Sequence, residues 1–261
     1  MNRKYKRKEN KGIYGDAIDY HFYHMNLLEY LAGFGLGFLA GAFVIMVFFS
    51  ILYPALIIGI ISGVVGVIFL RKYLLKRRSK DLLDQFRDFL ESLATSYSAG
   101  KNTATAFRDS LTDLSRIYPD NAYIIQEIKL LIKGISNNRT IESMLLDFGD
   151  RSGLDDIESF VDVFVETGRQ GGNMSEIIVD VRSIISEKIE TETEIGRVTN
   201  NSKVEMNIMM GIGICILLFV NYSNIMSLAD NTPINIIMKT AVLVIYFVAY
   251  LWSRKILRIK M

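Results

Sequence analysis

The longest uncharged stretch is the feature that most constrains the fold of this 261-residue chain: residues 31–70 contain no Asp, Glu, Lys or Arg. A helix crosses the hydrocarbon core of a bilayer with about 20 apolar residues. The stretch therefore predicts two membrane spans, residues 31–49 and 54–70, joined by a turn at residues 50–54. A cleaved signal peptide fits poorly, because the stretch continues directly into a second span.

A second hydrophobic hairpin is predicted at residues 206–253. Residues 206–229 carry no charge and predict a third span at 206–227. A fourth is predicted at 234–252, although Lys239 interrupts it, because Pro233 and Trp252 are typical of interfacial ends. We therefore expect an all-α membrane protein with four transmembrane helices in two hairpins.

Basic residues set the expected orientation. Six Lys and Arg lie in residues 1–12, six in 71–80 and four in 254–261. The positive-inside rule places such stretches in the cytoplasm. We expect a multi-pass protein of the cytoplasmic membrane, with a basic juxtamembrane segment at 1–30, a basic tail at 254–261 and both termini in the cytoplasm. The basic stretches should attract anionic membrane lipid.

The segment between the hairpins, residues 71–205, is then a cytoplasmic domain. Residues 81–205 contain 23 Asp and Glu against 13 Lys and Arg, a net charge of 13 − 23 = −10. Nucleic acid is not expected as a partner, because phosphate binding needs a basic surface. The acidic surface either confers solubility or binds a partner with a basic face.

Apolar residues in this domain recur at helical spacing, and no segment alternates with a period of two. A bundle of about six helices is predicted. Their expected limits are Leu82 to Gly100, Thr103 to Pro119, Asp120 to Ile135, Thr140 to Gly149, Ile157 to a break at 168–172, and Asn173 onward into the third span. After Ile189 the last helix becomes polar, which predicts a stalk that couples the domain to the membrane.

Few residues suggest chemistry. Cys215 is the single cysteine, so neither an intrachain disulfide nor a multi-cysteine metal site is possible. Asp19, His21 and His24 could together bind a metal, but we favour an amphipathic juxtamembrane helix with its rings at the interface. The motifs of nucleotide hydrolysis, zinc proteolysis and serine hydrolases are absent. The sequence predicts no enzyme and no cofactor.

Lys239 is the one charge within a predicted span. A charge in a membrane span is a functional candidate by default. Lys239 lies near the outer end of its span, and we favour the interpretation that its side chain extends to the outer interface.

Glycines recur at four-residue spacing in the first two spans. They are Gly33, Gly37 and Gly41 in the first, and Gly59 and Gly63 in the second. Such faces let helix backbones approach closely. They can serve packing within the hairpin or association between subunits, and we favour the first.

Residues 165–178, which include Gly168, Gly171, Gly172 and Asn173, resemble an element of the F-domain family of type II secretion and type IV pilus platform proteins. The likeness is greatest to the TadB and TadC branch of the tight-adherence (Tad) pilus machinery. Residues 98–100 and Ala106 match the family's first helix–glycine–helix unit. Two features depart from the family: its usual basic residues after this element are replaced by the sequence Ser-Glu-Lys-Ile-Glu at 186–190, and the proline common where the third span begins is absent.

This resemblance implies a non-catalytic inner-membrane platform with an F-type cytoplasmic domain at 71–205. Such a platform would couple a cytoplasmic secretion ATPase to the extraction of pilin or pseudopilin subunits and to filament assembly. A second F-domain protein or another copy of the chain would be a further partner. The implied partner contacts are Glu166, Gly168, Gly171, Gly172 and Asn173; alternatively, their loop is only a break between helices.

Two other functions fit the sequence less well. A transporter or permease subunit should line a path with polar residues, but the spans offer little beyond Asn221 and Lys239. A membrane sensor needs an outer surface, and the predicted outer loops are very short.

Overall fold

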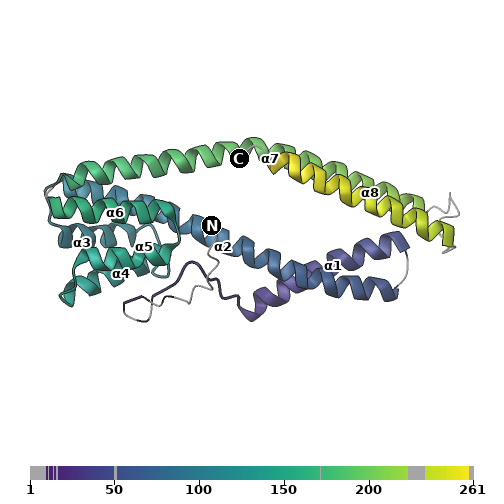
Figure 1. Cartoon of the computed structure of the whole chain (residues 1–261), viewed down its shortest axis with the longest axis horizontal. Coiled ribbons are helices and arrows are strands. Elements are labelled where there is room, and N and C mark those ends of the chain that lie inside the picture. Colours follow the sequence, from purple (N-terminus) through teal and green to yellow (C-terminus); the bar gives the residue numbers. More distant parts are fainter. Residues whose placement is uncertain are drawn as a thin grey trace, which may run out of the picture. The chain divides into compact units, whose positions relative to one another are not determined.

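The computed structural model contains helices and no strand over the residues it describes, which are 10, 12–13, 15, 17–49, 52–170, 172–222 and 233–258 (Figure 1). In chain order the helices are α1 (Leu27–Phe49), α2 (Leu52–Ser98), α3 (Thr103–Leu114), α4 (Tyr123–Ser136), α5 (Ile141–Ser152), α6 (Asp155–Gln170), α7 (Met174–Tyr222) and α8 (Pro233–Arg258). They divide into two compact units. The helical domain combines the N-terminal segment up to His24 with residues 72–191, and the apolar unit combines residues 25–71 with the chain from Glu192 onward.

α1 and α2 are long and apolar enough to cross a membrane, over Leu27–Met46 and within Tyr53–Ser98. Only 11% and 17% of their most apolar windows are buried inside the structure. Exposed side chains such as Leu36 and Ile61 would be unfavourable in water by about 1.5–3 kcal/mol each. These two helices are therefore candidate membrane spans rather than core helices of a soluble domain.

The other two predicted spans fall within α7 and α8, except that residues 223–227 lie outside the described part of the chain. The same holds for the expected outer loop that carries Asp230. Lys239 lies within α8, and its side chain is also outside the description. The four-span arrangement stays a prediction.

Two long helices, α2 and α7, each contain a predicted membrane span and a predicted helix of the cytoplasmic domain. α2 begins at Leu52, so the predicted turn at 50–54 is too long: Pro54 lies in the first turn of the helix, where a missing N–H is tolerated. The helix continues without a break to Ser98. α7 is likewise one helix of 49 residues that contains the predicted stalk.

Glycines bring α1 and α2 into close contact. A Cβ atom on Gly37 would lie 2.5 Å from the Ser62 carbonyl oxygen, and one on Gly63 would lie 2.7 Å from the Phe34 ring. Ser62 Oγ also donates a hydrogen bond of 2.7 Å to the Gly37 carbonyl. The remaining predicted glycines, Gly33, Gly41 and Gly59, face the other helix in the same way. All five glycines therefore lie at the contact between α1 and α2, and a role in association between subunits stays a separate prediction.

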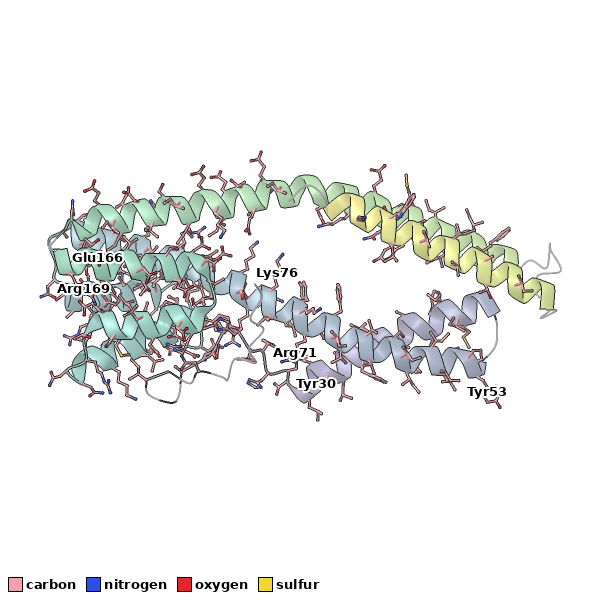
Figure 2. The ribbon with its side chains drawn as sticks, viewed as in Figure 1. Tyr30, Tyr53, Arg71, Lys76, Glu166 and Arg169 are labelled. Carbon is pink, nitrogen blue, oxygen red and sulfur yellow. The ribbon has the colours of Figure 1, made fainter. Side chains whose placement is uncertain are left out.

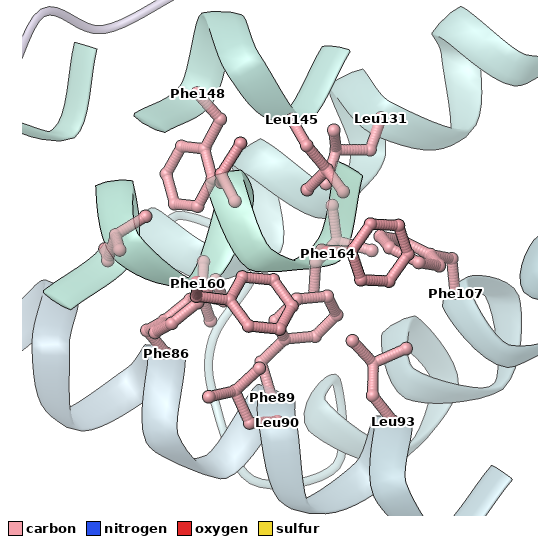
Figure 3. Close-up of a cluster of buried hydrophobic side chains, with 14 of the residues drawn as sticks. Phe86, Phe89, Leu90, Leu93, Phe107, Leu131, Leu145, Phe148, Phe160 and Phe164 are labelled. Atoms are coloured by element: carbon pink, nitrogen blue, oxygen red, sulfur yellow. The ribbon is translucent and has the colours of Figure 1, made fainter. Parts of the chain in front are cut away.

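The core of the helical domain is a cluster of aromatic rings around α2 (Figure 3). The Phe86 ring lies 5.4 Å from the ring of Phe160 on α6, and the Phe89 ring lies 5.5 Å from that of Phe107 on α3, both edge to face. Other buried members are Leu82, Leu90, Leu93, Ile124, Ile125, Ile128, Leu131, Leu145, Phe148, Val161, Phe164, Ile178 and Ile185. The helical spacing predicts most of these positions.

Two helix starts differ from the prediction because of local hydrogen bonds. The N-cap of α3 is Asn102 rather than Thr103, and its side-chain oxygen accepts the N–H of Thr105 at 2.9 Å. α4 begins at Tyr123 rather than at Asp120, because residues 119–122 form a turn first.

α5 begins directly after Thr140, as predicted, but it does not end at Gly149. Gly149 is buried inside the helix, where a Cβ atom would be in contact with Val161 of α6. The helix continues to Ser152, and Gly153, with φ of +64°, ends it. Gly149 therefore allows close packing of two helices instead of stopping one.

We predict that Gly37→Ala destabilises the α1–α2 pair by about 1–3 kcal/mol, because the new methyl group would overlap a backbone oxygen. The matched control is Gly35→Ala on the same helix, where nothing lies within 4 Å of the added Cβ. Thermal unfolding of the full chain in detergent should show a lower midpoint for Gly37→Ala alone. Equal midpoints for the two variants would contradict the packing described above.

Candidate functional site

The predicted partner-binding loop lies between α6 and α7. Glu166 and Gly168 belong to the last turns of α6, which ends at Gln170, so the break predicted to begin at Gly168 starts too early. Figure 2 shows Glu166 and Arg169 at the end of α6 that leads into α7. The connection contains Gly172 and Asn173, and Gly171 lies outside the described residues.

The chain turns tightly at Gly172, directly after α6. Its N–H donates to the carbonyl oxygen of Thr167 at 3.1 Å, which closes the end of α6. A Cβ atom at Gly172 would lie 2.7 Å from Thr167 Cγ2. Asn173 directly precedes α7, and its carbonyl oxygen accepts the N–H of Ile177 at 3.4 Å. α7 thus begins at Met174, one residue after the predicted start near Asn173.

The turn between α2 and α3 lies beside this connection. The hydroxyl groups of Ser98 and Ser175 are 2.8 Å apart and share a hydrogen bond. Gly100, with φ of +74°, ends α2 through hydrogen bonds from the N–H groups of Gly100 and Lys101 to the carbonyls of Tyr97 and Ser96. Hence the two helix–glycine–helix units meet at one end of the helical domain.

We call this end the paired-turn surface and define it as residues 98–102, 166, 168–169, 172–173 and 175–176. Nearly all of it is exposed, including Glu166, Arg169 and Glu176. Lys101 is paired with Asp109 at 2.5 Å. Charged side chains displayed on turns that rigid helices position are suited to recognition of another protein.

The paired-turn surface offers little for catalysis. Tyr97 is its nearest half-buried titratable group and donates to Thr103 Oγ1 at 2.9 Å. Burial raises the pKa of Tyr97, so this phenol stays protonated at neutral pH. Across the described residues, no group of three His, Cys, Asp or Glu could hold a metal ion.

The N-terminal histidines lie elsewhere, and the helix expected for them is wrong. Residues 19–24 form a turn and an irregular segment on the helical domain, and α1 begins only at Leu27. Asp19 is buried, and its carboxylate accepts the N–H groups of Asn10 at 2.8 Å and His21 at 3.0 Å, and contacts His21 Nδ1 at 2.9 Å. The pair of Asp19 and His21 therefore stabilises a turn.

Comparison with known proteins identifies one family. The model of "Type II secretion system (T2SS), protein F" matches residues 89–221, which is 133 of the 261 residues. The match includes both glycine turns and most of α7. No curated protein and no solved structure matches the chain.

The Asp19 carboxylate should make the stability of the helical domain depend on pH. Burial alone would raise the pKa of Asp19, but hydrogen bonds from the Asn10 and His21 backbone and the His21 ring hold it below its ordinary value of 3.8. The ionised carboxylate therefore stabilises the fold above pH 3.8, and this contribution disappears as the pH falls through the folded-state pKa.

We expect the wild-type chain to be more stable than Asp19→Asn at neutral pH, with the difference shrinking below pH 3.8. Urea unfolding of both proteins between pH 7 and pH 3 measures it. A difference that stays constant over this range would show that the ionised carboxylate is not responsible.

Proposed function

This chain belongs to the type II secretion system protein F family, and we propose from this membership that it is the inner-membrane platform of a tight-adherence or similar type IV-like pilus machine. Members of the family are generally non-catalytic membrane platforms that work with an ATPase and pilins. In this proposal a separate cytoplasmic ATPase hydrolyses ATP. The platform itself transmits the resulting motion and catalyses no reaction.

The observation that carries the proposal is the extent of the family match. Residues 89–221 include the last part of α2, all of α3 to α6 and the apolar residues of α7 from position 206. Two continuous helices, α2 and α7, contain residues of both units. In the helical domain, Phe86 and Phe89 anchor α2 while Ile178 and Ile185 anchor α7. Such helices are suited to carry a displacement of the domain toward the predicted spans.

The paired-turn surface is the proposed contact for the ATPase. Glu166, Gly168, Gly172 and Asn173 are exposed on it, and Gly171 is adjacent in sequence. The acidic charge of residues 81–205 favours a partner with a basic face. Pilin or pseudopilin subunits and a second platform subunit are the proposed partners within the membrane.

The proposed topology has four spans, with both termini and the domain in the cytoplasm. Arg71 and Lys76 are exposed on α2 after its apolar stretch, as Figure 2 shows, where they can attract anionic lipid headgroups. Removal of this chain from its host should abolish filament assembly while the pilin remains in the membrane. Normal export without the chain would exclude the platform function.

Charge reversal tests the proposed ATPase contact. We expect Glu166→Arg to reduce copurification of the cytoplasmic secretion ATPase with the full chain about tenfold, which corresponds to 1.4 kcal/mol. Asp162→Arg is the matched control, since Asp162 is an exposed acid one turn earlier on α6, outside the paired-turn surface. Equal loss in both variants would indicate that only the overall charge matters, and no loss in either would place the contact elsewhere.

A further inference from the structure

The N-terminal segment of the helical domain is held by side chains from three helices. Tyr20 is only 2% exposed, although it lies outside any helix. Its ring packs edge to face against Tyr123 of α4 at 5.8 Å, and the Arg78 guanidinium of α2 lies 4.7 Å from its centroid. Tyr20 is thus an aromatic anchor enclosed by an aromatic ring and a cation.

A buried ion pair lies next to Tyr20. Arg151 of α5 and Glu127 of α4 are 2% and 1% exposed, and two hydrogen bonds of 2.8 and 2.7 Å join them. Arg151 Nε also donates to Asp147 at 2.9 Å. A buried charge pair is stable only when its remaining donors and acceptors are satisfied.

The N-terminal segment supplies several of the remaining partners. The Tyr20 hydroxyl donates to Glu127 Oε1 at 3.0 Å, and Arg151 Nη1 donates to the Ile18 carbonyl oxygen at 2.8 Å. The Tyr20 N–H donates to the Arg151 carbonyl at 2.9 Å. Release of the segment would break three directional bonds at once, two to the charged groups of the ion pair and one to the Arg151 backbone.

A fourth bond holds the end nearest to α1. Arg78 Nη1 donates to the Phe22 carbonyl oxygen at 3.1 Å. Five residue steps separate Phe22 from Leu27, where α1 begins, and a fully extended chain covers at most about 18 Å in five steps. As long as Phe22 is held, the start of α1 cannot move farther than this from it.

We propose that residues 17–24 are a latch that ties the beginning of α1 to the helical domain, with Tyr20 as the residue that closes it. The latch is a third connection between the domain and the predicted spans, besides α2 and α7. Its role in export rests on the proposed platform function: with the latch closed, a displacement of the domain also pulls on α1. Tyr20 is a positioning residue, because it acts only by holding the segment.

The test compares amide hydrogen exchange of residues 17–24 in the full chain in lipid nanodiscs. We expect slow exchange in the wild type, about tenfold faster exchange in Tyr20→Phe, which loses one hydrogen bond, and at least ~100-fold faster exchange in Tyr20→Ala. The amides of α4 and α5 should remain protected. Tyr73→Ala is the control, because Tyr73 is 58% exposed on α2 in the same domain.

Unprotected exchange of residues 17–24 in the wild type, or unchanged protection in Tyr20→Ala, would overturn the latch. If Tyr20→Ala also speeds the exchange of α4, the exchange rate of residues 17–24 in Tyr20→Phe becomes the test. That variant keeps the aromatic ring and loses only the hydroxyl group. The second measurement is filament export: Tyr20→Ala, present at the wild-type level in the membrane, should lose export, while Tyr73→Ala should retain it. Normal export in Tyr20→Ala, with residues 17–24 shown to exchange rapidly, would overturn the role of the latch in export. Normal export in cells that lack the whole chain would instead overturn the platform function.

Discussion

The helical domain depends on the aromatic stripe of α2. Phe86 contacts rings of α5 and α6, and Phe89 contacts a ring of α3, so three helices pack on one. The earlier part of the same helix packs in the opposite way, with Gly59 and Gly63 against the rings of Phe38 and Phe34 on α1. Water favours burial of large rings, whereas in an apolar medium helices gain by close approach of their backbones. The change from glycine to phenylalanine along α2 fits a helix that passes from one medium to the other.

The part of the fold that periodicity encodes could be predicted from the sequence. The stripe from Leu82 to Leu93 and the apolar face of α4 are buried as expected, because a repeat of three and four residues places them on one side of a helix. Helix ends were less predictable, since neighbouring residues compete for them. Asn102 rather than Thr103 caps α3, and Gly149 serves a helix contact instead of a stop. At the candidate site, the Gly172 turn was predictable, while its contact with the α2–α3 turn through Ser98 and Ser175 was not, because 77 residues separate the two.

The latch was missed because nothing local encodes it. Residues 17–24 show no period, and their partners lie 56 to 133 positions later in the chain. The sequence around the two charged partners, Glu127 and Arg151, does indicate that they are buried. Glu127 falls on the apolar face that Ile124, Ile128 and Leu131 define, and Arg151 follows Phe148 by three residues on the corresponding face of α5. Charges of opposite sign on two apolar faces predict a buried pair. The sequence pattern cannot reveal which segment completes the pair.

The polar groups around Tyr20 can explain why this one segment docks on the helical domain. Half of the residues in this chain are hydrophobic, so a purely apolar groove would accept many segments, including those of the predicted spans. The Glu127–Arg151 pair instead requires a hydroxyl donor and a carbonyl acceptor at fixed positions, which Tyr20 and Ile18 supply. Burial of such a pair adds little net stability, but a wrong occupant would leave charges unsatisfied at a cost of several kcal/mol. The ion pair thus contributes specificity to the docking of the N-terminal segment, and the rings around Tyr20 contribute its affinity.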